Sequence, residues 1–477
     1  MIATIKPHCF SAELRVPTSK SHTIRRLIIA TLANGVSEII HPLDSLDTRS
    51  CVAVCRALGA EINEHRGADP VSANPEDEKG EKLLSWTVRG LTHNAATGAP
   101  KHCDVGNSGT TLFLALAAAA LGNGPVEFDG DEQIRRRSAA PLLEALAGLG
   151  ISVKSAENGC APITVYGSWK GGRVSLPCPT SQYLSALLLA APLAPAGVIT
   201  EIDIPLLNER PYIEMTLSYL DSQGIRYEAA QDFSYFKIPG GSRWQPVSGT
   251  APADFSSAAF PAAAAAITGG PVKLLGLDPD DTQGDKAFFG FLEKMGCRVK
   301  WEQVPTKHIP LGQYVSTGLR AIGQKALELD IAEWQLMVSR RDTIYGREFD
   351  LNNTPDLFPA LAAVACFARG DTALVNIAHA RLKETDRIMV MAEELMNLGI
   401  KTTERPDGLV IHGRGDVLPE ANSGGHIRTD GHGDHRVVMA LAVAALGCPL
   451  PVEIAGAERA AATYPGFLEL LGANVIQ

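Results

Sequence analysis

The sequence lacks the features of a secreted or membrane-bound chain. Its nine cysteines are odd in number, scattered and without a CxxC pair, which favours free thiols in a reducing compartment over a disulfide framework. The longest apolar stretches, such as residues 112–121, are about half the roughly 20 residues that a membrane-spanning helix needs. The N-terminal segment has no apolar region followed by a small-residue cleavage site, so we expect no signal peptide and a cytoplasmic location.

Positive charge is also scarce. The chain has 43 Lys and Arg residues against 53 Asp and Glu residues, a net charge of −10. Broad binding of nucleic acid or of an anionic membrane needs a basic surface, so we expect neither partner, although a small anionic substrate needs only a few local cations. The chain has no GxxxxGK loop and no GxGxxG motif that opens a βαβ unit, which argues against a nucleotide site. His432 and His435 could bind a metal, but no further spacing supports one, and we expect none.

Internal repeats indicate how the 477 residues are organised. An amphipathic helical pattern, a glycine and a short strand-like run follow one another six times, as around Leu149-Gly150-Ile151. Each glycine fits a helix C-cap, because glycine adopts the left-handed conformation without a Cβ penalty. The six glycines are Gly59, Gly150, Gly224, Gly296, Gly399 and Gly472.

A second pattern also occurs six times between these glycines. A small polar cluster, suited to capping a helix, precedes an Ala- and Leu-rich helical run. These runs are apolar nearly all round, which is typical of buried helices. One such helix could serve packing alone, but six copies indicate six βαβ-type units. The copies are SKSHTIRRLIIATLANG, GNSGTTLFLALAAAALG, TSQYLSALLLAAPLAPAG, DFSSAAFPAAAAAITGG, PDLFPALAAVACFARG and GDHRVVMALAVAALG.

Two groups of three units would make two α/β domains. Small residues and proline cluster at residues 249–252, which places a boundary there. Extra length falls in residues 60–103 and 301–348, and the polar stretch at residues 74–82 is expected to be a loop insertion.

Cations lie among the polar clusters, at the expected helix starts. Helix N-termini expose N–H groups and attract anions, so an acidic chain with cations at these points predicts a cleft for a polyanionic small molecule. Two plainer interpretations stay open here. The three arginines at residues 135–137 could form a solvated face, and Lys383 and Asp386 could be an ion pair along a helix.

An ordered set of motifs resembles the 5-enolpyruvylshikimate-3-phosphate (EPSP) synthase family of enolpyruvyl transferases over nearly the whole chain. The resemblance implies two inside-out α/β domains, each of three βαβαββ repeats, joined by a double crossover with the active site in the cleft between them. The expected domains are residues 17–251, and residues 1–16 with 252–477. The motifs are SKSHTIRR, GNSGTT, TSQYLSALLLAAPLA, RPYIEMTL, DFSSAAF, QGDKAF, PDLFPALA, RLKETDRI and GDHR.

The resemblance also implies a reaction and its residues. The enolpyruvyl group of phosphoenolpyruvate moves to the 5-hydroxyl of shikimate 3-phosphate and phosphate leaves, in a monomer without a cofactor. By motif, Asp356 is the base, Glu384 the acid, and Lys20 stabilises charge and shares proton transfer. Arg137, Gln182, Arg387 and Arg436, with His435 nearby, hold phosphoenolpyruvate, while Gly109 in GNSGT leaves room for it and Asn107 lies beside it. Ser21, Arg25, Thr180, Ser181, Tyr212 and Lys383 hold the shikimate phosphate.

Four positions depart from the family pattern. Ala462 replaces a lysine that contacts phosphoenolpyruvate, and a lost charged hydrogen bond costs about 1.5–3 kcal/mol. Phe113 replaces an arginine. His379, in the substrate-binding set, replaces an asparagine that contacts the shikimate ring. Glu209 replaces a serine of the phosphate site; aimed at that phosphate, it would repel it by about 4 kcal/mol at ~4 Å with an effective dielectric near 20.

These departures keep other functions open. The chain could be a paralogue that acts on another shikimate- or cyclitol-like acceptor in secondary metabolism, with Glu209 and His379 as acceptor-reading changes. It could also be a non-catalytic ligand-binding relative, which the presence of Asp356 and Glu384 argues against. The UDP-N-acetylglucosamine enolpyruvyl transferase family pairs lysine with asparagine in its first motif and usually carries a reactive cysteine on a mobile loop. That family is disfavoured, because Ser21 follows Lys20 in this chain and residues 132–138 contain no cysteine. RNA 3′-phosphate cyclase is disfavoured by the acidic balance and the motifs.

Overall fold

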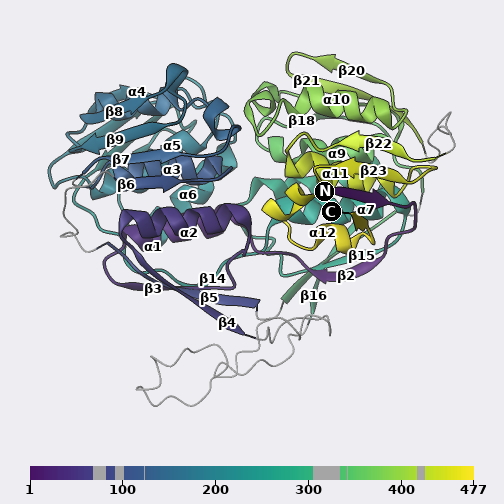
Figure 1. Cartoon of the computed structure of the whole chain (residues 1–477), viewed down its shortest axis with the longest axis horizontal. Helices are drawn as coiled ribbons and strands as arrows, with labels where there is room; N and C mark the ends of the chain where they lie inside the picture. Colours follow the sequence, from purple (N-terminus) through teal and green to yellow (C-terminus); the bar gives the residue numbers. More distant parts are fainter. Residues whose placement is uncertain are drawn as a thin grey trace.

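The computed structural model describes residues 1–67, 82–91, 101–122, 124–304, 333–340, 342–415 and 425–476. These residues form two lobes, each with helices and sheets (Figure 1). The predicted loop insertion at residues 74–82 lies outside the described residues except for Lys82.

Each lobe contains three copies of one unit, with strand–helix–strand–helix–strand–strand order. In every copy the first two strands pair in parallel, and the others pair antiparallel in a four-stranded sheet. This confirms the expected mixed α/β fold of βαβαββ repeats. One unit is β6 (Lys101–Asp104), α3 (Gly109–Ala119), β7 (Val126–Asp129), α4 (Ala140–Gly148), β8 (Ile151–Ser155) and β9 (Ile163–Gly167).

The other two units of the first lobe follow the same order. One is β14 (Ser248–Thr250), α1 (Lys20–Leu32), β3 (Val36–Ile40), α2 (Leu46–Leu58), β4 (Glu61–Gly67) and β5 (Lys82–Arg89). The other is β10 (Gly172–Ser175), α5 (Gln182–Ala190), β11 (Ile199–Asp203), α6 (Arg210–Ser222), β12 (Glu228–Ala229) and β13 (Tyr235–Pro239).

The second lobe repeats the arrangement three times. Its first unit is β2 (Ala12–Arg15), α7 (Phe255–Thr268), β15 (Val272–Leu275), α8 (Ala287–Met295), β16 (Arg298–Val304) and β17 (Glu333–Ser339). The second is β18 (Glu348–Asp350), α9 (Phe358–Ala365), β19 (Arg369–Val375), α10 (Arg387–Asn397), β20 (Thr402–Arg405) and β21 (Gly408–Arg414). The third is β22 (Ile427–Asp430), α11 (His435–Ala445), β23 (Val452–Ala455), α12 (Phe467–Leu470) and β24 (Asn474–Ile476), completed by the N-terminal strand β1 (Ile2–Ile5).

The chain crosses between the lobes twice, along adjacent paths. Strands β1 and β2 belong to sheets of the second lobe, and β14 closes a sheet of the first. The Ser19 amide donates to the Pro252 carbonyl at 2.7 Å, and the Asp254 amide donates to the Pro17 carbonyl at 2.8 Å. These bonds fasten the two crossing segments to each other beside the start of α1.

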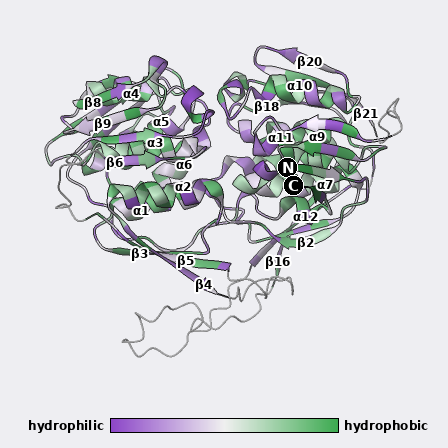
Figure 2. Ribbon diagram, viewed as in Figure 1, coloured by the Kyte–Doolittle hydropathy of each residue, from purple (hydrophilic) through white to green (hydrophobic). Residues whose placement is uncertain are grey.

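The six alanine- and leucine-rich helices form the centres of two separate hydrophobic cores. Helices α1, α3 and α5 lie in a core that runs from Ile24 to Trp244. Helices α7, α9 and α11 lie in a core made of residues 3–16 and 253–471. Hydrophobic residues are concentrated along these inner helices (Figure 2), as expected for helices that are apolar all round. The division at residues 16/17 and 251/252 stays a prediction, which the two cores support.

The repeated glycines all adopt the predicted conformation. Each lies at or directly after the C-cap of an outer helix and has a positive φ, which only glycine adopts without steric cost. The φ values are 120° at Gly59, 94° at Gly150, 64° at Gly224, 111° at Gly296, 82° at Gly399 and 68° at Gly472.

Capping of the inner helices is predicted correctly for four of the six. Ser19, Ser108, Asp254 and Asp434 accept a backbone N–H through their side chains. The expectation is wrong for α5 and α9, which have no such bond. At α5 the N-cap is Ser181, and its hydroxyl donates to Glu209, the N-cap residue of α6 in the same lobe.

Candidate active site

The starts of the inner helices meet in one polar cleft between the lobes. Its walls come from the first residues of α1, α3, α5 and α11, from the start of α6 and α10, and from the 3₁₀ turn η7 (Pro355–Leu357). Exposed N–H groups at these helix starts give the cleft a positive potential. The lining residues are Lys20, Ser21, Arg25, Asp47, Gly109, Thr110, Arg137, Ser181, Gln182, Glu209, Tyr212, Asp356, Lys383, Glu384, Arg387, His435 and Arg436.

The structure brings nearly all of the sequence-predicted residues into this cleft. Three of them do not line it: Asn107, Thr180 and His379. Asn107 lines an adjoining cavity and accepts a bond from Arg137 at 3.4 Å. Thr180 donates to Glu209 at 3.1 Å. His379 is buried near Glu209, whose charge acts on its ring, and its Nε2 has no partner among the described residues.

One buried guanidinium holds both predicted catalytic carboxylates. Arg387, the first residue of α10, is only 1% exposed. It donates from Nη1 to Asp356 Oδ1 at 2.8 Å and from Nη2 to Glu384 Oε2 at 2.7 Å. Its Nε donates to Asp434 Oδ2 at 2.7 Å, and Asp434 is fully buried at the N-cap of α11. The acid and the base therefore take their positions from one side chain.

Asp356 is held in its ionised form. Burial alone would raise its pKa, but the charges of Arg436, Lys383 and Arg387 outweigh burial and lower the pKa far below its usual range. Arg436 also donates to Asp356 Oδ2 at 2.9 Å. A carboxylate that is ionised at neutral pH can accept a proton, as a base must.

Glu384 is ionised as well. Burial would raise its pKa, but the charges of Arg137 and Arg387 outweigh burial and hold the pKa well below the ordinary value. Arg137 Nη2 lies 3.3 Å from Glu384 Oε1. Burial and the charge of Lys20 lower the pKa of His435, which is therefore neutral.

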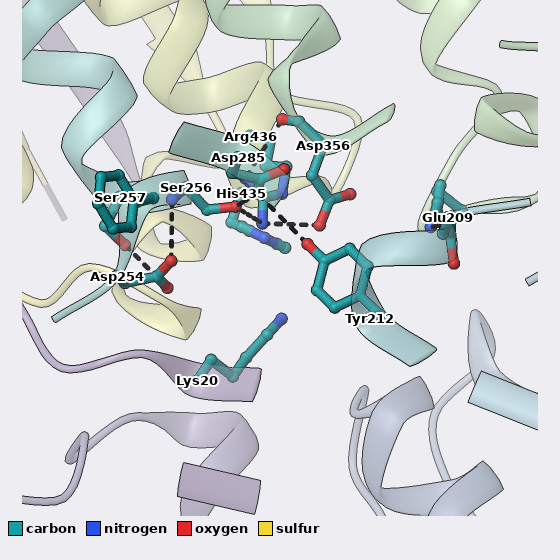
Figure 3. Close-up of polar contacts among 12 residues, drawn as sticks. Lys20, Glu209, Tyr212, Asp254, Ser256, Ser257, Asp285, Asp356, His435 and Arg436 are labelled. Carbon is teal, nitrogen blue, oxygen red and sulfur yellow. Dashed lines mark hydrogen bonds and ion pairs between the residues drawn. The ribbon is translucent and has the colours of Figure 1, made fainter. Parts of the chain in front are cut away.

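Lys20 is fixed by a carboxylate that the sequence analysis missed. It is the first residue of α1, and its Nζ donates to Asp47 Oδ2 at 3.0 Å. Figure 3 shows Lys20 pointing from α1 toward His435 and Tyr212. Asp47 lies in the first turn of α2 behind a Ser45 capping box. That capped start resembles the other polar clusters, and this signal could have identified Asp47.

The three consecutive arginines divide between solvent and cleft. Arg135 and Arg136 are exposed and pair with Asp129 and Glu132, as the solvated-face interpretation expected. Arg137 instead enters the cleft, where it contacts Glu384, and its buried Nε has no partner among the described residues.

Gly109 leaves space for this arginine. A Cβ at position 109 would lie 2.5 Å from Arg137 Nη1, so a larger residue would displace the guanidinium rather than only fill substrate space. Phe113, one turn further along α3, is buried and packs edge-on against Tyr183. This departure from the family pattern is therefore part of the hydrophobic core.

The predicted phosphate-binding residues hold a carboxylate of the chain itself. Glu209 Oε2 accepts from the Ser181 amide at 3.0 Å, the Ser181 hydroxyl at 2.9 Å and the Thr180 hydroxyl at 3.1 Å. Its Oε1 accepts from Lys383 Nζ. The carboxylate thus lies at the centre of the predicted phosphate donors, which is the position that the expected repulsion of a phosphate assumes.

Of the other three residues assigned to the phosphate, Ser21 lines the cleft, and the side chains of Arg25 and Tyr212 are engaged with the protein. Arg25 is buried, donates to Thr216 at 2.9 Å and to Ser185 at 3.2 Å, and its pKa is lowered to about 10 by burial. The Tyr212 hydroxyl donates to Asp285 Oδ2 at 3.3 Å.

Asp285 is a second residue that the sequence analysis missed. It lies in the QGDKAF motif, which was quoted without a role, in the 3₁₀ turn η5 (Gly284–Lys286). The Ser256 hydroxyl donates to Oδ2, while Oδ1 is buried and has no partner among the described residues (Figure 3). Burial and then the charge of Asp356 raise its pKa to about 7.

No metal centre is found in the described part of the chain. None of its histidines, cysteines and carboxylates form a group of three that could hold a metal ion, and His432 pairs with Glu394 at 2.8 Å. All nine cysteines are free thiols. Among the described helices, none has the length and apolar character needed to cross a membrane.

Comparison with known proteins gives one consistent result. A family profile described as EPSP synthase (3-phosphoshikimate 1-carboxyvinyltransferase) matches residues 5–471. The chain is 42% identical to a 3-phosphoshikimate 1-carboxyvinyltransferase of Acetivibrio thermocellus, over 99% of this chain and 97% of that protein. It is 41% identical to the 3-phosphoshikimate 1-carboxyvinyltransferase of Ruminiclostridium cellulolyticum, over 98% of this chain and 97% of that protein.

Solved structures show the same architecture. An EPSP synthase from Acinetobacter baumannii matches with a TM-score of 0.74 and 25% identity over all of both chains. The enolpyruvyl transferase NikO from Streptomyces tendae matches with a TM-score of 0.69 at 18% identity, covering 99% of this chain and 97% of that one, and shows the shared fold alone.

Asp285 makes stability depend on pH. Its raised pKa means that the folded chain keeps a proton which the unfolded chain, with a pKa of about 3.9, has lost. The contribution of Asp285 to the free energy of unfolding is therefore fully present below about pH 4 and is lost as the pH rises to about 7. Relative to the wild type, Asp285→Asn should gain about 3 kcal/mol of unfolding free energy between pH 5 and pH 8, measured by urea unfolding. Asp280→Asn, at an exposed neighbour, is the control, and a difference that does not change with pH would contradict the assignment.

Proposed function

The chain belongs to the EPSP synthase family, and we propose that its cleft transfers the enolpyruvyl group of phosphoenolpyruvate to the 5-hydroxyl of shikimate 3-phosphate. The observation that carries this proposal is the pair of carboxylates, Asp356 and Glu384, held on Arg387 inside a cleft lined with cations. The proposal includes no cofactor, nucleic acid or membrane, and takes the enzyme to act as a monomer.

The phosphoenolpyruvate end of the cleft is the group of three guanidiniums around the carboxylate pair. Arg137, Arg387 and Arg436 come from different elements and converge on Glu384 and Asp356. Planar guanidiniums match carboxylate and phosphate groups with two parallel hydrogen bonds. The Arg137 Nε is a buried donor without a partner in the described structure, and a carboxylate or phosphate oxygen can accept its hydrogen bond.

The chemistry requires an addition and an elimination, each with proton transfer, and charge stabilisation. Asp356 takes the proton of the acceptor hydroxyl as its oxygen bonds to the central carbon of phosphoenolpyruvate, and Glu384 gives a proton to the methylene carbon. The resulting methyl carbon then returns a proton to Glu384 as the C–O bond to phosphate breaks, and the leaving phosphate takes the proton held by Asp356, which gives the enol ether and inorganic phosphate. Lys20, fixed by Asp47, stabilises the charge that moves onto the phosphate.

The free enzyme holds Glu384 in the wrong protonation state for an acid, and substrate binding corrects this. The low pKa of Glu384 comes from the charges of Arg137 and Arg387, against the effect of burial. An anionic substrate on these arginines compensates their charge and adds its own, so the pKa of Glu384 rises. Binding of phosphoenolpyruvate thereby favours the protonated form of Glu384, which is the form that donates a proton in the proposed reaction.

The missing lysine at position 462 has a neighbouring cation. Arg459 and Ala462 lie on the same 3₁₀ turn η9 (Ala457–Ala462), three residues apart and so on one face. Both line a cavity that shares Asp47, Glu384 and His435 with the catalytic cleft. We propose that Arg459 supplies the charge that the family lysine supplies elsewhere.

Turnover tests the proposed reaction. Phosphate release from phosphoenolpyruvate should reach about 1–10³ s⁻¹ with shikimate 3-phosphate, and fall to background with unphosphorylated shikimate or buffer. Asp356→Asn and Glu384→Gln should each lower kcat by about 10²–10⁴-fold, while Asp371→Asn, at an exposed site on β19, should change it little. Absence of release with shikimate 3-phosphate from folded enzyme would reject the reaction.

Proton uptake tests the loading of Glu384. Binding of phosphoenolpyruvate at pH 8, where its phosphate is ionised because the second pKa is about 6, should take up as much as about one proton per site. Calorimetry in two buffers of different ionisation enthalpy measures this number. Glu384→Gln should abolish the uptake, and an equal uptake by wild type and variant would show that another group takes the proton.

A rescue experiment tests Arg459. Arg459→Ala should raise the KM for phosphoenolpyruvate by about 10-fold, the lower end of the effect of a charged hydrogen bond, with little change in the KM for the acceptor. Adding Ala462→Lys to that variant should restore the KM. Arg428→Ala, an exposed arginine of β22, is the control. An unchanged KM in Arg459→Ala would exclude the role.

A further inference from the structure

Four donors converge on the carboxylate of Glu209. They are the amide and hydroxyl of Ser181, the hydroxyl of Thr180 and the ammonium group of Lys383. A backbone N–H at the start of α5, two hydroxyls and a cation form the donor set expected of an anion site. The anion that fills it is supplied by the chain, and Glu209 is only 2% exposed.

Glu209 also joins the two lobes across the cleft. Ser181 and Thr180 belong to the first lobe, and Lys383 follows the 3₁₀ turn η8 (Ala378–Leu382) of the second. The Glu209 amide donates to the Asn352 carbonyl at 3.3 Å, also across the cleft. The backbone of Glu209 has a φ of 60°, a conformation uncommon for a residue other than glycine. The carboxylate therefore does in the free chain what a bound anion would do, because it links donors from both lobes.

The charge of Glu209 is stable under ordinary conditions. Burial would raise its pKa, but the charges of Lys383 and His379 outweigh burial and lower the pKa. Protonation therefore does not vacate the site at neutral pH. A second anion can use the four donors only if the carboxylate leaves them, since like charges on one donor set repel each other.

We infer that Glu209 is an internal competitor for the phosphate group of the acceptor, and that acceptor binding displaces its side chain from Ser181, Thr180 and Lys383. This inference rests on the proposed function, because that function places a phosphate monoester in the cleft. Glu209 is thus a residue that determines affinity and specificity. It lowers the advantage of a phosphorylated acceptor over an unphosphorylated one.

A partner for the displaced carboxylate lies near Glu209, outside the residues that line the cleft. His379 is buried close enough for the charge of Glu209 to raise its pKa, against the lowering by burial, and its Nε2 has no hydrogen-bond partner among the described residues. On this inference the displaced carboxylate turns toward His379 while the Glu209 amide stays on Asn352. Glu209 and His379, two of the four departures from the family pattern, would then act together when the acceptor binds.

Binding measurements test the competitor directly. Calorimetric titration with shikimate 3-phosphate should give a Kd at least about 10-fold lower for Glu209→Ser than for the wild type, since the site regains free charged donors. Glu209→Gln, which keeps the shape but not the charge, should give an intermediate Kd. Glu214→Ser, on the outer part of the same helix with Arg210 as its partner, is the matched control and should leave the Kd unchanged.

Two reference ligands make the result specific. The Kd for unphosphorylated shikimate and the KM for phosphoenolpyruvate should change by less than about 2-fold in Glu209→Ser, because neither uses the vacated donors. Equal tightening of shikimate and its phosphate would overturn the inference, and so would an unchanged or weaker Kd for shikimate 3-phosphate in Glu209→Ser that melts like the wild type. Binding is measured apart from turnover, so tighter binding without phosphate release would reject the proposed reaction and still support the competitor.

Discussion

The site depends on one buried cation, the guanidinium of Arg387. It is charged, almost completely enclosed, and bonded to Asp434, Asp356 and Glu384 at once. Removing one partner of such a buried network leaves an uncompensated charge, which costs about 3–5 kcal/mol. Asp434 is also the N-cap of α11, so the helix start and the acid–base pair are fixed by the same interaction. Catalytic geometry and local folding therefore cannot be varied independently here.

The second constraint is that the cleft is shared between two cores that do not merge. Arg137 reaches Glu384, Glu209 reaches Lys383, and His22 reaches Asp281 from opposite lobes. Each contact pairs a cation or a neutral donor with a carboxylate in a poorly hydrated space, where an unpaired group would be expensive. The charges on the two walls of the cleft thus compensate each other. On the proposed function an anionic substrate replaces some of these internal partners, so the groups that set the pKa values of Asp356 and Glu384 are the groups proposed to bind the ligand.

Much of the fold could be predicted because it depends on local rules repeated six times. The glycines at Gly59 and its five counterparts need a left-handed C-cap, and apolar runs such as that of α3 need burial, so the repeat count follows from the sequence. The motifs then located the cleft residues. What the sequence could not reveal is pairwise geometry. The capped start of α2 could have singled out Asp47 as a helix-start residue, but its contact with Lys20, like that of Asp285 with Tyr212, joins residues far apart along the chain. Ser181 was expected to cap α5, but a closer acceptor from α6 takes its hydroxyl.

The four departures from the family pattern no longer form one class once their surroundings are known. Phe113 packs against Tyr183 inside a core and does not reach the cleft. Ala462 shares its turn with Arg459, so a charge can be supplied three residues away. Glu209 and His379 lie close enough to interact electrostatically, and they are the two departures to which the inference above assigns an effect on acceptor binding. None of the four takes part in the hydrogen bonds of Arg387 to Asp356 and Glu384, although Lys383, the partner of Glu209, acts on Asp356 through its charge. A change in the acceptor site can therefore adjust affinity for a phosphate group while the bonds that position Asp356 and Glu384 stay as they are.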